Sequence, residues 1–152
     1  MGRFHLALFL SLAGVFIIDQ NIKAIFLEGF RYYTECIDLI LVFNKGVAFS
    51  MFAFLEEWLK WLQLLLIGGI LGYVLWKRAL CYSIPSGLLI GSGLSNVYDR
   101  FVHGGVVDYV YWHCGFDFAV FNFADVMIDV AVAWMLLINL KPHWCRGEDA
   151  AV

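Results

Sequence analysis

The sequence predicts an integral membrane protein that is mainly α-helical, with four transmembrane helices and a small extramembrane β-sheet on the outer side. Of the 152 residues, 62% are hydrophobic and 15% are charged, which is more apolar surface than one soluble domain of this size can bury. The mean hydropathy is +0.80. Aromatic residues make up 18% of the chain, and Trp and Tyr are favoured where lipid headgroups meet hydrocarbon.

Four apolar stretches are each close to the roughly 20 residues that cross a bilayer; they span residues 4–27, 58–76, 84–98 and 120–140. The third stretch is the shortest and contains several glycines and serines, which suits a helix packed tightly against its neighbours. No small-x-small cleavage site follows the first stretch, so we expect an uncleaved helix. Together these helices form one expected membrane-embedded domain over residues 1–152.

The distribution of positive charge predicts how the chain is oriented. Lysines and arginines near the helix ends gather on one side of the expected membrane: Arg3, Lys77, Arg78, Lys141 and Arg146. Such residues mark the cytoplasmic side. We therefore expect both termini inside, and the segments 28–57 and 99–119 outside.

Both outer segments contain runs of β-prone residues. Ile37 to Phe43 is followed by the turn signal Asn44-Lys45-Gly46, and Val106 to Tyr111 is entered through two glycines. These patterns predict strands. We expect them to form a small sheet on the membrane, with a short amphipathic helix following the first turn.

Polar residues interrupt the apolar stretches in three pairs, whose spacing puts each pair on one helix face: Asp19 with Lys23, Asn96 with Asp99, and Asn122 with Asp125. A charge within a spanning helix costs about 2.5–3.5 kcal/mol, so each needs a partner or a task. All three pairs lie at outer helix ends, where they could converge at one depth. The alternative is separate surface ends that snorkel or hydrogen-bond for packing alone.

Asp108 and Asp125 stand out among the acidic residues. Asp108 lies in the middle of the second outer segment, and Asp125 lies about one turn inside the fourth helix. Two carboxylates brought close together cannot both ionise cheaply, so one holds a proton while the other stays an anion. That division provides the acid and the base that hydrolysis by an activated water requires.

Five ordered motifs, spread over nearly the whole chain, match a known family. They are Asp19-Gln20-x-x-Lys23, Asn44-x-Gly46-x-Ala48-Phe49, Asn96-x-x-Asp99-Arg100, Val106-Val107-Asp108-Tyr109 and Phe121-Asn122-x-Ala124-Asp125. With these motifs the sequence resembles the lipoprotein signal peptidases, the type II signal peptidases of bacteria. One such motif would be a weak signal, whereas five in order are specific.

The resemblance implies a membrane aspartic endopeptidase that removes the signal peptide from diacylglyceryl-modified prolipoproteins, cleaving before the lipidated Cys. Asp108 and Asp125 match the catalytic aspartates of the family, which act through water without a covalent intermediate and titrate as a pair. The resemblance also implies a multi-pass protein of the bacterial inner membrane, with its active site at the outer, periplasmic face. No cofactor and no metal are expected.

Other residues take supporting roles by resemblance. Those expected to hold the substrate or the carboxylates are Asn44, Asn96, Arg100 and Asn122, with Gly46 allowing a turn beside Asn44. Asp19, Lys23 and Asp99 are expected to be structural. Asp129, one turn deeper than Asp125, matches no motif, and it is expected to be a neutral buried acid or a hydrogen-bond partner.

Two other functions are compatible with a small membrane protein. A four-helix transporter coupled to protons or cations would place its acids near the middle of the membrane and have short outer loops. A non-enzymatic assembly factor would tolerate alanine at Asp108 and Asp125. The formal charge of −3 provides no basic surface for nucleic acid. The expected partners are therefore prolipoproteins and membrane lipid, and a monomer could hold every motif.

The four cysteines lack C-x-x-C spacing, so no metal site is expected from them: Cys36, Cys81, Cys114 and Cys145. Free thiols are the default expectation. A bridge between Cys36 and Cys114 stays open, because both are expected outside, where a disulfide is permitted.

Overall fold

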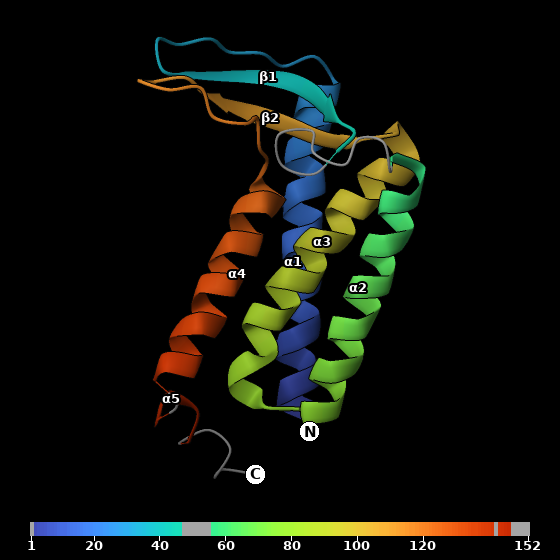
Figure 1. Cartoon of the computed structure of the whole chain (residues 1–152), viewed down its shortest axis with the longest axis vertical. Coiled ribbons are helices and arrows are strands. Elements are labelled where there is room, and N and C mark those ends of the chain that lie inside the picture. The colour runs from blue at the N-terminus through green and yellow to red at the C-terminus, as the bar shows by residue number, and fades with distance from the viewer. Residues whose placement is uncertain (1, 47–55, 142, 147–152) are drawn as a thin grey trace.

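Four long helices lie side by side in the computed structural model, and a two-stranded sheet lies across one end of them (Figure 1). The structure describes residues 2–46, 56–141 and 143–146. In chain order the elements are α1 (Gly2–Leu27), β1 (Ile37–Asn44), α2 (Glu56–Lys77), the 3-10 turn η3 (Leu80–Tyr82), α3 (Ser83–His103), β2 (Val106–Trp112), α4 (Phe123–Leu140) and α5 (His143–Arg146). The expectation of a mainly helical protein with a small sheet is confirmed.

Three of the described helices are long and apolar enough to cross a membrane. They comprise Gly2–Leu27, Trp58–Lys77 and Phe123–Leu140. Their outward faces carry large apolar side chains such as Phe9, Leu65 and Leu136, each more than half exposed in the isolated chain. Lipid is the medium in which such faces are stable.

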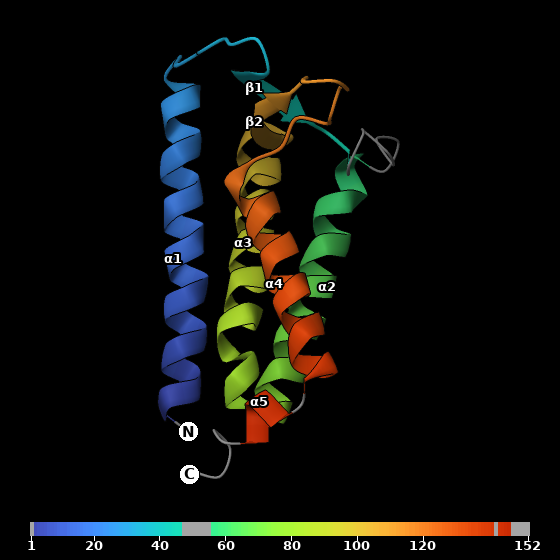
Figure 2. The ribbon, with the colours of Figure 1, turned by 90° about the vertical axis from the view of Figure 1, so that its left-hand side faces the viewer.

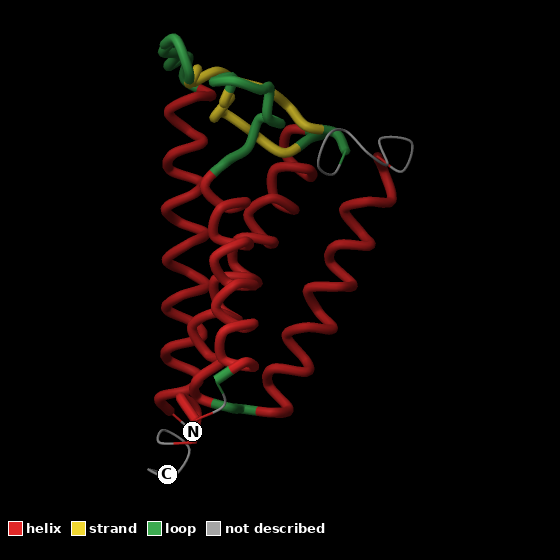
Figure 3. Tube along the Cα trace, turned by 60° about the vertical axis from the view of Figure 1, so that its left-hand side comes forward, coloured by secondary structure: helices red, strands yellow, loops and turns green. Residues whose placement is uncertain are grey.

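Helix α3 is the least apolar of the long helices and packs against the other three (Figure 2). Two of its glycines lie against the backbone of α1: a Cβ atom on Gly87 would be 2.5 Å from the Leu8 carbonyl oxygen, and one on Gly91 would be 2.5 Å from Val15 Cγ1. Small residues let two helix backbones approach closely. The expected tight packing of this helix is therefore confirmed. At the end of the bundle that carries the sheet, helix α2 diverges from the other helices (Figure 3).

The sheet joins the two β-prone segments that the sequence indicates. Strands β1 and β2 are antiparallel, with Val42 opposite Asp108 and Asn44 opposite Val106, and the register is irregular between Leu39 and Val42. This pairing places Asp108 over the ends of the helices. The expected amphipathic helix, and the Ala48-Phe49 part of the second motif, fall at residues 47–55, outside the described residues.

Two helix ends differ from the expected ones. Helix α3 continues to His103 instead of ending at residue 98, so Asp99 and Arg100 are helical and not part of an outer loop. Both side chains are buried and hydrogen-bonded to other parts of the protein or to the helix itself. The helix therefore continues until Gly104, whose left-handed backbone, with φ 73°, ends it. Helix α4 begins at Phe123 rather than residue 120, because Phe121 pairs with Val110 in a β-bridge. The ends of α1 and α2 lie within two residues of expectation.

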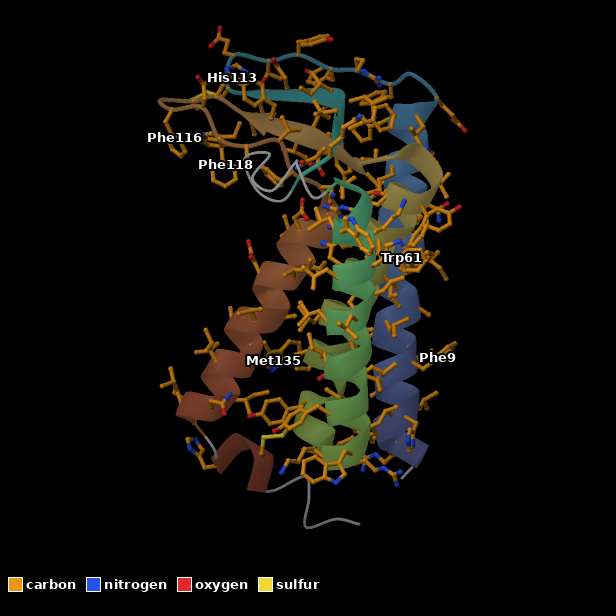
Figure 4. All side chains as sticks on the ribbon, turned by 45° about the vertical axis from the view of Figure 1, so that its right-hand side comes forward. Phe9, Trp61, His113, Phe116, Phe118 and Met135 are labelled. Carbon is orange, nitrogen blue, oxygen red and sulfur yellow. A yellow bond between two sulfur atoms is a disulfide. The ribbon has the colours of Figure 1, made fainter. Side chains whose placement is uncertain are left out.

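The expectation of free thiols is wrong, since the structure joins the cysteines in two disulfides, Cys36–Cys114 and Cys81–Cys145. Cys36 and Cys114 come together because strand pairing brings Ile37 opposite Trp112 and continues with a hydrogen bond from His113 N to the Cys36 carbonyl. The second pair ties η3 to α5 at the other end of the bundle (Figure 4). The Cys36–Cys114 bridge is the alternative that the sequence left open, whereas the pairing of Cys81 with Cys145, 64 residues apart, was not predicted.

The close approach of α1 and α3 is testable by Gly91→Ala. The added methyl group would overlap Val15 and the Leu12 backbone, and overpacking of this kind costs about 1–3 kcal/mol. We expect a lower unfolding temperature in detergent, measured by tryptophan fluorescence. Gly72→Ala is the matched control, because among the described residues no atom beyond its own stretch of helix lies within 4 Å of the added methyl group. Equal unfolding temperatures for the two variants would contradict the packing described.

Candidate active site

A buried lysine joins α1 to α3 just below the sheet. Lys23 Nζ lies 2.6 Å from an Asp19 oxygen and 2.6 Å from an Asp99 oxygen, and it donates a 2.9 Å hydrogen bond to Asn96 Oδ1. Its side chain is only 1% exposed. A buried charge is tolerated only when it is paired and its hydrogen bonds are satisfied, and here three oxygens satisfy the ammonium group.

The two carboxylates around Lys23 extend this polar core to the neighbouring elements. Asp19 accepts hydrogen bonds from Ser95 Oγ at 2.7 Å and from the Ala124 backbone N–H at 2.9 Å, which lies in the first turn of α4. Asp99 accepts from Gln20 Nε2 at 2.8 Å and from the second backbone N–H of β2 at 3.1 Å. The core therefore fixes the start of α4 and the start of β2 relative to each other.

The first turn of α4 has its free N–H groups satisfied by side chains. Asn122 caps the helix: its Oδ1 accepts from the Asp125 N–H at 2.9 Å, and its own N–H donates to Asp125 Oδ2 at 3.1 Å. This is a capping box, which satisfies two backbone donors reciprocally. The Phe123 N–H donates to the Tyr109 hydroxyl oxygen at 2.9 Å. The Asp125 carboxylate is thereby held at the N-terminus of α4.

Three asparagines connect the two aspartates. Asn122 Nδ2 donates to Asp108 Oδ1 at 2.7 Å, and Asn44 Nδ2 donates to Asp108 Oδ2 at 3.0 Å. Asn96 Nδ2 donates to Asp125 Oδ1 at 2.8 Å, while Asn96 Oδ1 accepts from Asn122 Nδ2 at 3.1 Å. Each carboxylate thus has fixed donors on one side, and one asparagine contacts both.

Both aspartates line a cavity of about 630 Å³ between the sheet, α3 and α4, with Gln63 contributing from α2. Phe118, in the segment after β2, lines it as well (Figure 4). A space of this size falls in the range of ligand sites. Among the described residues, no group of three His, Cys, Asp or Glu side chains is placed to hold a metal ion.

Burial, and to a smaller extent the neighbouring Asp125, raise the pKa of Asp108 from its ordinary value of 3.8 to about 7. The hydrogen bonds from Asn44 and Asn122 and the charge of Lys23 act the other way, because they stabilise the ionised form. A carboxyl group that titrates near neutral pH can hold or release a proton during a reaction.

Arg100 holds the end of β1 over the cavity. Its Nη2 donates to the Gly46 carbonyl at 2.7 Å and its Nη1 to the Asn96 carbonyl at 3.2 Å. The Gly46 N–H in turn donates to Asn44 Oδ1 at 3.1 Å, which makes the bend beside Asn44 that the sequence indicated. The Arg100 Nε atom has no hydrogen-bond partner among the described residues, and it belongs to a side chain that lines the cavity.

The three polar pairs found in the sequence therefore meet in one network and are not separate surface ends. Sequence reasoning did not identify Ser95, the Tyr109 hydroxyl or Gln63. Gln63 left a signal, since it is an isolated amide in an apolar stretch. Asp129 is exposed on α4 and lines the same cavity, so it is not the buried acid that was expected; its position four residues after Asp125 places it on the same helix face.

Comparison with known proteins places the chain among signal peptidases. A family model described as signal peptidase (SPase) II matches residues 11–141. The lipoprotein signal peptidase of Sulfurimonas denitrificans is 69% identical over 142 residues, which cover 93% of each chain. That of Sulfurovum sp. is 69% identical over 87% of this chain and 92% of its own, and that of Helicobacter pylori is 60% identical over 81% and 80%.

Two solved structures of a bacterial membrane enzyme share the fold. Their TM-scores are 0.75 and 0.74 at sequence identities of 23% and 22%. Each similarity covers 87% of this chain, and 86% and 91% of the other chain. The arrangement of helices and sheet described above is therefore one that a solved bacterial membrane enzyme adopts.

The polar core is testable by Lys23→Met, which keeps the side-chain length and removes the charge. Asp19 and Asp99 would then be buried without a counter-charge, and breaking a buried pair in this way costs about 3–5 kcal/mol. We expect a strongly lowered unfolding temperature in detergent. Lys60→Met, which removes a charge lying over the Phe101 ring, is the matched control. An unchanged unfolding temperature for Lys23→Met would show that the ammonium group does not hold the bundle.

Proposed function

The chain belongs to the signal peptidase II family, and from that membership we propose that Asp108 and Asp125 are the catalytic pair with which it removes the signal peptide from prolipoproteins. The observation that carries this assignment is the single asparagine that contacts both carboxylates: Asn122 donates from its side chain to Asp108 and from its backbone to Asp125. Both carboxylates line one cavity.

In the proposed reaction a water molecule lies between the two carboxyl groups. The ionised carboxylate takes a proton from the water while the water oxygen attacks the scissile carbonyl carbon. The protonated carboxyl group gives its proton to the carbonyl oxygen, and a gem-diol forms. The carboxyl group that took a proton from water then gives that proton to the leaving amine, while the other carboxylate takes back a proton from a gem-diol hydroxyl group. The new bonds are C–O and N–H, the C–N bond breaks, and no covalent intermediate with the enzyme forms. The raised pKa of Asp108, about 7, keeps one proton on the pair near neutral pH.

The proposed substrate is a diacylglyceryl-modified prolipoprotein, cleaved just before the lipidated Cys. The cavity lies at the end of α4, next to side chains that face lipid in our assignment, so a peptide and its lipid can reach it together. Asn96 and Asn44 orient the carboxylates through the bonds described. Arg100, with its unpartnered Nε, and Gly46 are proposed to lie beside the substrate backbone.

We propose that all four long helices cross the membrane as one domain. Helix α3 has 21 residues, about 31 Å at 1.5 Å per residue, and its polar residues face the other helices instead of lipid. The start of α1 and the described end of the chain lie at the end opposite to the sheet (Figure 1). Arg3, Lys77 and Lys141 lie at that end as well, and positive residues favour the cytoplasm. The sheet and the catalytic cavity would then be periplasmic, on a protein of the bacterial inner membrane.

This orientation puts the two disulfides in different compartments. Cys36–Cys114 lies beside the sheet, on the proposed periplasmic side, where disulfides persist. Cys81–Cys145 lies at the proposed cytoplasmic end, where thiols are kept reduced, so detection of this bond in cells would count against the proposed orientation. All the residues assigned to the site come from a single chain, which is consistent with a monomer.

The transporter alternative expects acidic residues midway along the helices. Asp125 instead lies in the first turn of α4 and Asp108 lies in β2. These positions favour a surface site that a peptide can reach.

Substitution of either aspartate tests the assignment. Asp108→Asn and Asp125→Asn each remove a group that must exchange a proton, so we expect cleavage of a diacylglyceryl-modified prolipoprotein by purified enzyme to fall by about 10²–10⁴-fold or more. Asp117→Asn is the control, because Asp117 is an exposed acid bonded to the Tyr111 hydroxyl. Gel filtration and unfolding temperature check the fold of each variant. Cleavage at the wild-type rate by either folded variant of the pair would refute the assignment.

The pH dependence of cleavage tests the state of Asp108. Its folded pKa of about 7 means that the proton is held below that pH and lost above it, so kcat/KM should fall as the pH rises through about 7. Asn44→Ala removes a hydrogen bond that favours the ionised form, which raises the pKa. We expect kcat/KM of Asn44→Ala to decline at a higher pH than that of wild type. A shift to lower pH would contradict the role given to Asn44.

A further inference from the structure

A second cavity lies at the end of the bundle opposite to the sheet. It has a volume of about 440 Å³ and is enclosed by α1, α2, α3, α4 and the turn before α3. None of its lining residues belongs to the catalytic cavity. Met135 on α4 lines it and lies on the side of that helix toward α2 (Figure 4).

The lining of this cavity changes from polar to apolar with depth. At the helix ends it contains Lys77, the last residue of α2, and Tyr82, just before α3. About two turns deeper it contains Ile70 on α2 and Leu89 on α3. A space with a charged mouth and an apolar interior suits an amphiphile.

Ser86 lies between these two layers, about one turn into α3. Its side chain is 1% exposed, it lines the cavity, and its Oγ has no hydrogen-bond partner among the described residues. A buried hydroxyl group without a partner is unfavourable. A ligand that places a carbonyl oxygen at this depth would accept the hydrogen bond that Ser86 can donate.

The positive charge at the mouth of this cavity determines which charge a ligand should carry. The Lys77 ammonium group lies 4.6 Å from the centroid of the Trp76 ring and 6.0 Å from that of Tyr73, and these aromatic faces hold it there. None of the residues described as lining the cavity is Asp or Glu. The mouth therefore favours an anion, and it disfavours the positively charged start of a signal peptide.

We propose that this cavity binds one anionic phospholipid. The order of its groups matches the order of the lining: the phosphate at Lys77, a glycerol ester carbonyl at Ser86, and an acyl chain between Ile70, Leu89 and Met135. Tyr82 and Asn139, whose side chains are joined by a 3.2 Å hydrogen bond, line the cavity as well. The bound lipid would fill the gap between α2 and α4 and brace the bundle at the end away from catalysis.

Native mass spectrometry of the full-length protein, titrated in detergent with phosphatidylglycerol or phosphatidylcholine, tests this proposal. We expect one phosphatidylglycerol to be retained in preference to phosphatidylcholine. Lys77→Gln should weaken that preference about fivefold, the effect of one lysine on an anionic lipid surface. Ser86→Ala should weaken retention of both lipids. Lys60→Gln, the same change of charge at the other end of α2, should have no effect.

Three outcomes would overturn the proposal. One is equal retention of the two lipids by wild type, and another is an equal effect of Lys77→Gln and Lys60→Gln. The third is displacement of the lipid by a prolipoprotein peptide together with a changed KM in Lys77→Gln, which would assign the cavity to the substrate. Because lipid retention is measured without turnover, the result does not depend on whether Asp108 and Asp125 are catalytic.

Discussion

The ammonium group of Lys23 lies between the carboxylates of Asp19 and Asp99, 2.6 Å from an oxygen of each. The catalytic geometry depends on this buried contact, because the two proposed catalytic residues lie on separate elements. Asp19 holds the first turn of α4, which contains Asp125, and Asp99 holds the start of β2, which carries Asp108. One cation therefore sets the positions of both carboxylates.

Helix α3 shows why such a network needs an unusual helix. It carries Ser95, Asn96 and Asp99 on faces covered by its neighbours, and its glycines let α1 approach closely enough for Lys23 to reach them. Ser95, Asn96 and Asp99 each find a polar partner inside the protein, which the interior of a membrane requires. The same burial raises the pKa of Asp108 to about 7. Removal from water thus favours the protonated form of Asp108, and the pairing of Asp19 and Asp99 with Lys23 offsets the cost of burying those charges.

The sequence predicted most of this fold because its signals are local. Apolar length predicted the helices, β-prone runs predicted the two strands that pair, and the spacing of Asp19 with Lys23 and of Asn122 with Asp125 predicted shared faces. The end of α3 was missed, because Asp99 and Arg100 look like loop residues until buried partners are known. The Cys81–Cys145 disulfide was missed for the same reason, because contact between these residues is set by tertiary packing, whereas the Cys36–Cys114 bridge was left open as an alternative to free thiols. The capping role of Asn122 was readable from its spacing to Asp125.

The central proposal is that Asp108 and Asp125 share a proton, and infrared spectroscopy can observe such a proton directly. A difference spectrum between wild type and Asp108→Asn, followed over pH, reports whether Asp108 carries a proton. We predict that this difference spectrum contains a protonated carboxyl band from wild-type Asp108 that disappears as the pH rises through about 7. A band that disappears near the ordinary Asp value of 3.8, or a difference spectrum without such a band, would contradict a protonated Asp108 at neutral pH.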